Sequence, residues 1–143
     1  MLIANILRDK GGAVHIVDAA ATLAAAAVEL HQRRVGAMVV VDSGGGLAGV
    51  LSERDIVREV ARRGADALKD VVANAMTRDV ITASPHETVD DCLGRMTDRR
   101  IRHLPVLESR RLVGIVSIGD LVARKIEAAQ AEAAAMRAYI TAG

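Results

Sequence analysis

The chain contains two similar copies of roughly 60 residues in tandem, and this repeat limits its possible folds more than any other feature. Thr22-Leu23 in the first copy and Thr88-Val89 in the second each lead to an Arg-Arg pair, an apolar run and a short turn. The pattern Gly-apolar-apolar-Ser-x-x-Asp follows the turn in both copies. A unit of this size buries too little apolar surface to be comfortable alone, so we expect the two copies to pack on each other.

Each copy predicts the order strand, helix, strand, strand, helix, which is an α+β fold. Thr22 and Thr88 are typical helix N-caps, and Gly64 is a typical helix stop. Two apolar runs rich in branched residues, 37–41 and 104–107, are typical of buried strands. Hairpins would then join them to 47–51 and 112–116, after short opening strands at Val14–Val17 and Val80–Ala83.

The repeat predicts three segments: residues 1–66 with the first copy, 67–127 with the linker and the second copy, and 128–143 as a helical extension. From Asp120 to about Ile140 the chain can form one helix with an apolar stripe. Such a stripe should be buried, and we expect it to join two copies of the protein as a homodimer. The alternative is that the helix folds back beside the N-terminal Leu2, Ile3 and Ile6.

Composition argues against several classes of function. The chain has no Phe or Trp and one Tyr, so it lacks the aromatic platforms of single-strand binders. A net charge of +1 gives no electrostatic footprint for nucleic acid or an anionic membrane. Cys92 cannot form an intramolecular disulfide, and we expect a buried, inert thiol there. No signal peptide or membrane span is visible, so the sequence predicts a cytoplasmic protein.

The pairs Ser52–Asp55 and Ser117–Asp120 are the strongest local signals. On structural grounds alone they predict capping boxes, in which Ser and Asp each accept a backbone N–H at a helix start. The same geometry suits a nucleotide, because a helix N-terminus attracts phosphate and a carboxylate one turn in can accept both ribose hydroxyls.

The order of these motifs and their duplication together make the chain resemble the tandem CBS-domain (Bateman module) family. The resemblance rests on the two Ser-x-x-Asp repeats, on the connecting segment Ala75–Val80 and on Arg102-His103-Leu104-Pro105-Val106. It implies two β-α-β-β-α units that pack with pseudo-twofold symmetry and form two related clefts. In that family the clefts commonly hold AMP, ATP, NADH or S-adenosylmethionine. The Asp of the motif binds the ribose, and the adenine lies against the first strand of the opposite repeat.

Carried over residue by residue, the resemblance implies one cleft in which Ser52, Arg54 and Asp55 face Val80, Ile81 and Thr82. In the other cleft Ser117 and Asp120 would face His15, Ile16 and Val17.

The two copies are not equivalent in charge. Arg54 is cationic where its counterpart is Gly119, and Arg102-His103 is basic where the first copy has Gly36-Ala37. We therefore expect the Asp55 cleft to be the better phosphate site. Arg102 could instead lie in solvent while His103 bonds a structural carbonyl. Pro105, within a strand, indicates an edge or a ligand-facing position.

The function that follows is a stand-alone regulatory pair that binds an adenine nucleotide and signals to a partner protein, which the sequence does not identify. The cations favour AMP, ATP or NADH over S-adenosylmethionine. No catalytic residue, catalytic cofactor or metal site is expected, because no nucleophile–base pair or metal-ligand spacing is visible. The alternatives are a small nucleotide-processing enzyme and a purely structural dimerisation module with empty clefts.

Overall fold

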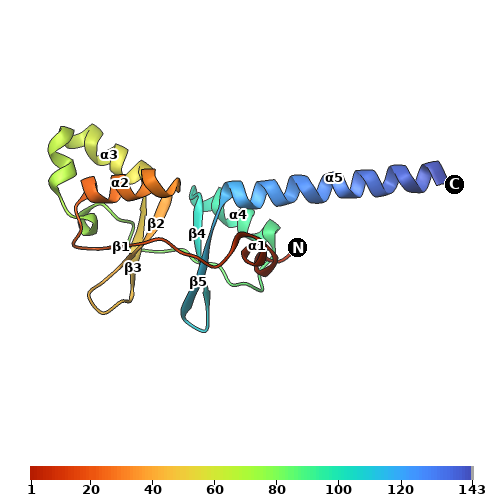
Figure 1. The fold of residues 1–143 in the computed structure, drawn as a ribbon, viewed down its shortest axis with the longest axis horizontal. Helices are drawn as coiled ribbons and strands as arrows, with labels where there is room; N and C mark the ends of the chain where they lie inside the picture. The colour runs from red at the N-terminus through yellow and green to blue at the C-terminus, as the bar shows by residue number, and fades with distance from the viewer. Residues whose placement is uncertain (143) are drawn as a thin grey trace. The chain divides into compact units, whose positions relative to one another are not determined.

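The computed structural model describes residues 1–142, and its contacts divide the chain into two units (Figure 1). The repeat-1 unit is Ala13–Ile81. The repeat-2 unit combines Met1–Gly12 with the chain from Thr82 onward. Both units mix helices and strands, as the sequence predicts for an α+β fold.

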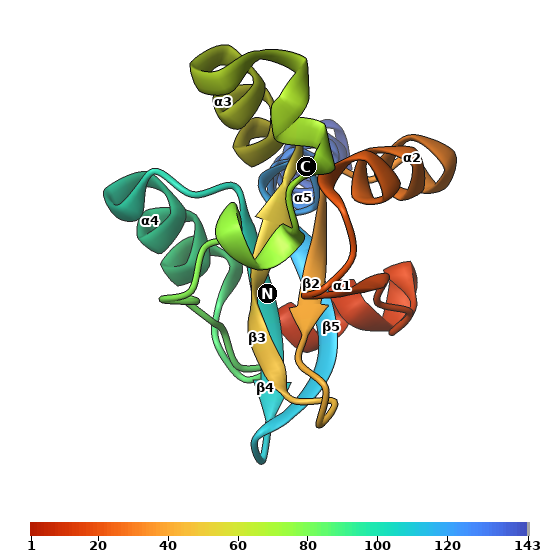
Figure 2. The ribbon, with the colours of Figure 1, turned by 90° about the vertical axis from the view of Figure 1, so that its left-hand side faces the viewer.

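The repeat-1 unit is built around a three-stranded sheet in the order β1-β2-β3. Strand β1 pairs in parallel with β2. Strand β2 forms an antiparallel hairpin with β3 (Figure 2). Its core is aliphatic and includes Leu23, Met38 and Leu51, which are almost fully buried. The elements are β1 (Ile16–Asp18), α2 (Leu23–Arg33), β2 (Ala37–Val41), β3 (Leu47–Ser52), α3 (Glu53–Arg63) and two 3-10 turns, η1 (Gly64–Lys69) and η2 (Val72–Asn74).

The helix starts and stops follow the local sequence signals. The Thr22 hydroxyl accepts the Ala25 amide at 3.1 Å, and Thr88 accepts the Asp91 amide in the same way. Helix α3 ends at Gly64, whose φ of 74° lies in the region that favours glycine. The predicted caps and the predicted stop are thereby confirmed.

The repeat-2 unit contains the hairpin of β4 and β5, flanked by three helices. Ser109 and Arg110 both adopt positive φ in the tight turn that joins the strands. The elements are α1 (Ile3–Lys10), α4 (Val89–Arg99), β4 (His103–Glu108), β5 (Arg111–Ser117) and α5 (Ile118–Ala142).

Helix α1 precedes the first copy in sequence but packs on the second. The Ile3 amide donates to the Glu87 carbonyl and the Ala4 amide to the Pro85 carbonyl, both at 2.9 Å. Ile3 and Ile6 are buried. Because α1 packs there, the first residues of the chain and its last helix belong to the same unit.

In the repeat-1 unit the linker between the copies plays the part that α1 plays in the repeat-2 unit, because it packs against the hairpin. Thr77, in the linker between the copies, exchanges backbone hydrogen bonds of 2.9 and 3.0 Å with Val50 of β3. A Cβ on Gly49 would lie 2.5 Å from the Thr77 carbonyl oxygen, so only glycine fits there without a shift. In both units, therefore, the segment that precedes one copy covers the hairpin of the other copy.

The opening strands are shorter than the sequence predicts. Strand β1 begins at Ile16 rather than Val14, and the segment 80–83 makes only a bridge from Ala83 to Val106. Ala83 donates to the Pro105 carbonyl and accepts from Leu107. The next bond of a parallel ladder would need an N–H on Pro105, which proline lacks, so the ladder ends there.

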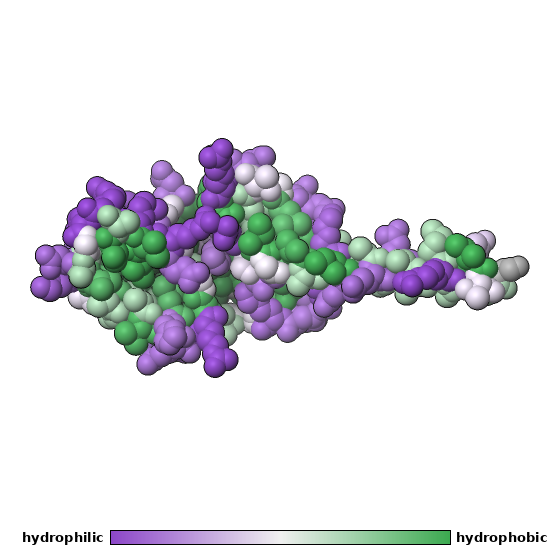
Figure 3. All heavy atoms as spheres, turned by 90° about the horizontal axis from the view of Figure 1, so that it is seen from above, coloured by the Kyte–Doolittle hydropathy of each residue, from purple (hydrophilic) through white to green (hydrophobic). Residues whose placement is uncertain are grey.

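Helix α5 runs unbroken for 25 residues, as the sequence predicts, and only Leu121 in it is buried. Beyond its first turns the side chains are exposed, and apolar and polar residues alternate along it (Figure 3). Met136 is 57% exposed and Ile140 is 70% exposed. The alternative in which this extension folds back beside Leu2, Ile3 and Ile6 is therefore wrong for the chain by itself.

Candidate functional site

Ser52 and Asp55 form a complete capping box at the start of α3. The Ser52 amide donates to Asp55 Oδ2 at 2.9 Å, and the Asp55 amide donates to Ser52 Oγ at 3.2 Å. Arg58, one turn further along, donates to Asp55 Oδ1 at 2.8 Å. Asp55 is 5% exposed, and two donors, the Ser52 amide and the Arg58 guanidinium, hold its carboxylate in one orientation.

Ser117 and Asp120 repeat this geometry at the start of α5. The Ser117 amide donates to Asp120 Oδ2 at 2.8 Å, and the Asp120 amide donates to Ser117 Oγ at 3.1 Å. The second donor to the carboxylate is Lys10 of α1, whose Nζ lies 2.6 Å from the same Oδ2. Burial raises the pKa of Asp120, but the hydrogen bonds from Lys10 and Ser117 outweigh it, and the pKa lies below its ordinary value.

Sequence reasoning missed both cationic partners. Arg58 carries a local signal, because three positions along a helix bring side chains onto one face. Lys10 carries none, since it is 110 positions from Asp120 and reaches it only through the docking of α1 on the second repeat.

The other candidate residues of the repeat-1 unit differ in exposure. Arg54 is exposed, and Val80 and Ile81 are half-buried. Ile16 is 56% exposed, whereas the Val17 side chain lies in the core, which leaves only its backbone for a ligand. His15 is half-buried, and its carbonyl accepts the Val39 amide at 3.2 Å.

In the repeat-2 unit Arg102 is exposed just before β4, and its carbonyl accepts the amide of Ile118, the first residue of α5. This bond places the Arg102 backbone beside the helix start that carries Asp120. His103 and Thr82 are half-buried, and Pro105 is buried. The predicted facing of Asp55 with Thr82, and of Asp120 with His15, joins residues of separate units and stays a prediction.

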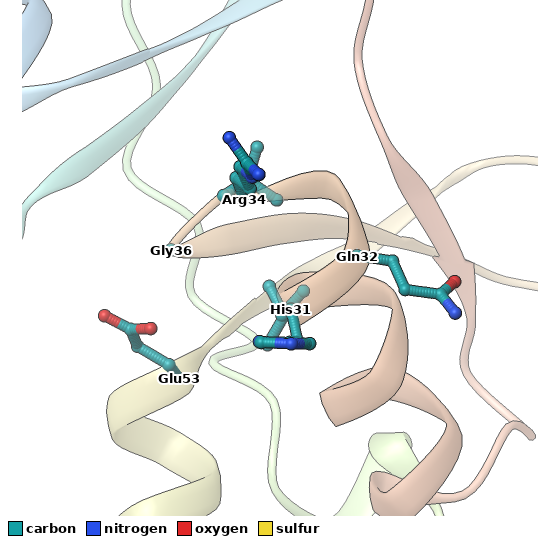
Figure 4. A pocket seen from close by; sticks show the side chains of 7 residues that line it. His31, Gln32, Arg34, Gly36 and Glu53 are labelled. Atoms are coloured by element: carbon teal, nitrogen blue, oxygen red, sulfur yellow. The ribbon is translucent and has the colours of Figure 1, made fainter.

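An open hollow of about 600 Å³ lies in the repeat-1 unit beside the Ser52–Asp55 box. Arg34 borders it after the end of α2, and Glu53 borders it at the start of α3 (Figure 4). The Glu53 amide donates to the Gly36 carbonyl at its edge. A cation and an anion therefore share this rim, which no sequence signal indicated.

Other chemistry is limited in the described residues. Residues 1–142 hold no group of three or more His, Cys, Asp or Glu side chains placed to bind a metal ion. No helix within that range is both long and apolar enough to cross a membrane. Cys92 is fully buried in α4, and burial raises the pKa of its thiol, as expected for an inert cysteine.

Comparison with known proteins agrees with the repeat. The family model described as CBS domain matches residues 12–62 and again 68–127. The mitochondrial CBS domain-containing protein CBSX3 of Arabidopsis thaliana is 37% identical over 118 residues, which cover 80% of this chain but only 57% of that relative.

Solved structures agree at the level of the fold. The CBS-domain containing protein of Agrobacterium tumefaciens superposes with a TM-score of 0.85 at 40% identity, covering 87% of this chain and 92% of its own. The CBS domain pair of protein MJ0100, solved in complex with 5'-methylthioadenosine and S-adenosyl-L-methionine, gives 0.77 at 28% identity over 90% and 97% of the two chains. Duplicated capping boxes, repeated hairpins and two family matches lead to one assignment: the chain belongs to the CBS-domain family and carries two copies of that domain in tandem.

Proposed function

We propose that the protein binds an adenine nucleotide of the AMP, ATP or NADH type through Asp55 and Asp120, and that binding regulates a partner protein. The observation that carries this proposal is that each copy holds a carboxylate in a fixed orientation at a helix start. Two vicinal ribose hydroxyls are donors that such a carboxylate can accept together.

Both carboxylates keep capacity for a ribose. A carboxylate has about four lone-pair positions, and Asp55 and Asp120 each accept one backbone amide and one cation. The side chain of Arg58 is 54% exposed and that of Lys10 is 36% exposed, so both cations can move or share when a ligand arrives. Because the capping amides remain in place, the carboxylate need not reorient.

The ligands in the MJ0100 complex support the adenosine part of the proposal, because 5'-methylthioadenosine and S-adenosyl-L-methionine both contain an adenosine. The exposed cations Arg54 and Arg102 favour a phosphate-bearing ligand for this chain. His103 is half-buried at the start of β4 and would join them when protonated. S-adenosylmethionine, which carries no phosphate, is therefore the second choice.

We propose regulation rather than catalysis because the capping geometry fully accounts for Ser52 and Ser117. Their hydroxyls accept helix amides, which is a structural role, and neither makes a described hydrogen bond to a histidine. An enzyme would need an activated nucleophile or base at the same place. Incubation with ATP separates the readings: steady release of ADP or AMP would contradict the regulatory proposal.

The apolar side chains exposed along α5 favour a homodimer, in which this helix contacts a second copy. Light scattering should then give twice the chain mass, and M136E/I140E should shift the protein towards monomer. A138E, on the opposite side of the same helix, is the matched control and should remain dimeric. A monomeric wild type at tens of micromolar would contradict the dimer.

Thermal-shift screening with AMP, ADP, ATP, NADH and S-adenosylmethionine tests the ligand class. A nucleotide at 100 times its dissociation constant should stabilise the fold by about 2.7 kcal/mol. Native mass spectrometry of the purified protein adds a direct search for a retained nucleotide. If no compound changes the melting temperature at millimolar concentration and none is retained, the proposal fails.

A further inference from the structure

The Asp120 carboxylate is neutralised by a cation from outside its own repeat. Lys10, the last residue of α1, donates to Asp120 Oδ2 at 2.6 Å and to the Ile115 carbonyl at 2.9 Å. These two bonds hold the ammonium group between β5 and the first turn of α5. Lys10 is thus placed by the docking of α1, which also buries Ile3 and Ile6.

Comparison of the copies shows why this cation matters. In the first copy Arg54 and Arg58 lie on the same helix as Asp55, and Arg58 bonds it directly. Their counterparts 65 positions later are Gly119 and Ala123, so α5 offers no cation at either place. Without Lys10 the Asp120 carboxylate would lose the cation that is bonded to it in the described part of the chain, and its negative charge would repel a phosphate group bound nearby.

The start of α5, which carries Asp120, is also less acidic than the start of α3, which carries Asp55. In the first copy the Gly36 carbonyl accepts the amide of Glu53, whereas in the second the Arg102 carbonyl accepts the amide of Ile118. Ile118 therefore takes the place of the acidic Glu53, and Arg102 takes the place of Gly36. At the start of α5 there are two cationic residues, Lys10 and Arg102, and one carboxylate, Asp120. The local charge is therefore positive, although the sequence of α5 alone would make it negative.

We infer that Lys10 makes the Asp120 site selective for an adenosine ligand that carries a phosphate group. This inference rests on the proposed function and assigns the phosphate to the site that the sequence had marked as short of cations. An ammonium group has three N–H donors, and Lys10 uses two of them within the described chain. The third remains for a phosphate oxygen while Asp120 keeps its other oxygen for the ribose.

The alternative role for Lys10 is competition, in which it occupies Asp120 and must leave before any adenosine binds. The two roles predict opposite effects of removing the charge. A phosphate-selecting lysine makes K10M lose AMP affinity and leaves adenosine affinity almost unchanged. A competing lysine makes K10M bind both compounds more tightly.

Titration calorimetry with AMP and adenosine tests the inference in a D55A background, where only the Asp120 site reports. K10M should weaken AMP binding about tenfold and change adenosine binding by less than about twofold. K10R, which keeps the charge, should retain most of the AMP affinity. K125M, which removes the exposed Lys125–Asp90 ion pair of the same unit, is the matched control and should change neither.

The variants should remain folded, because a partly exposed ion pair contributes little to stability; a urea melt of K10M checks this. Equal losses for AMP and adenosine, or tighter binding of both, would overturn the inference. So would D55A that binds neither compound while the wild type binds AMP, although the proposed function would then stand at Asp55. A wild type that binds neither compound would remove the proposed function itself.

Discussion

Leu7 of α1 lies directly over Gly114 of β5, so close that a Cβ on this glycine would come within 2.5 Å of the leucine Cδ2. The same arrangement recurs at Gly49, where Met76 and the Thr77 carbonyl take the place of Leu7. In each unit a segment from before one copy is packed against the hairpin of the other copy. Removing or loosening either segment should therefore weaken the repeat that it covers, which in the case of α1 is remote in sequence.

Gly49→Ala should destabilise the protein more than Gly114→Ala. At Gly49 the obstacle is a backbone oxygen that cannot move without breaking the Val50–Thr77 hydrogen bonds, so we expect a loss of about 1–3 kcal/mol. At Gly114 the obstacle is the end of the Leu7 side chain, which can rotate away at lower cost. Urea melts measure both, and the double variant G114A/L7A should recover part of the smaller loss. Equal costs at the two glycines would contradict this difference.

The Lys10–Asp120 pair should make stability depend on pH in the acid range. A carboxylate whose pKa is lowered by folding stabilises the native state above its unfolded pKa, and this contribution disappears as the pH falls through the folded value. D120N should therefore be less stable than wild type at neutral pH, by up to about 1 kcal/mol for a partly exposed pair. The difference should shrink below about pH 4.

Urea melts of both proteins across this range give the difference directly, and contributions of other carboxylates cancel in it. Glu87 beside Arg95 and Asp90 beside Lys125 also have lowered pKa values, so the wild-type curve by itself does not isolate Asp120. A difference that stays constant with pH would show that the carboxylate charge of Asp120 adds nothing to stability.

Cys92 should resist alkylation in the native protein. Its side chain is fully buried, and burial together with the nearby Glu87 raises the pKa of the thiol, so little thiolate forms at about pH 8. Iodoacetamide followed by mass spectrometry should find slow labelling in buffer and rapid labelling in guanidinium. Rapid labelling of the folded protein would mean that α4 opens locally.

Arg102→Ala and His103→Ala should weaken AMP binding and leave adenosine binding nearly unchanged. A phosphate brings charges that these residues can pair, whereas the nucleoside brings none. Equal losses for both ligands would give the two residues a role in shaping the pocket.

Much of the local structure could be predicted because its causes are local. Thr22, Ser52 and Ser117 bond amides three positions away, so the helix starts are encoded in short patterns. The shortened second opening strand follows from Pro105, which lacks the N–H that a longer ladder needs. The sequence alone does not predict this shortening, because it does not reveal that Ala83 pairs in parallel with Val106.

The charge of the candidate sites could be predicted only in part. Arg58 is one helical turn from Asp55 and could have been found by spacing. Lys10 is remote from Asp120 in sequence and reaches it because α1 docks on the second repeat. No periodic pattern in the sequence predicts this docking. The sequence-based choice of the Asp55 site for phosphate therefore compared Arg54 with Gly119 and Arg102-His103 with Gly36-Ala37, and it did not include Lys10.

The role proposed for the two capped aspartates is to bind the ribose of an adenine nucleotide, and calorimetric titration of AMP into D55A/D120A is the decisive test. Each substitution removes a charged acceptor worth about 1.5–3 kcal/mol, or about ten- to a hundredfold in affinity. T22A is the control, because it removes a helix cap at a similar folding cost of about 1 kcal/mol and touches neither aspartate. We expect wild type and T22A to bind AMP alike and the double variant to lose measurable binding. A folded double variant that binds AMP as tightly as wild type would contradict the claim.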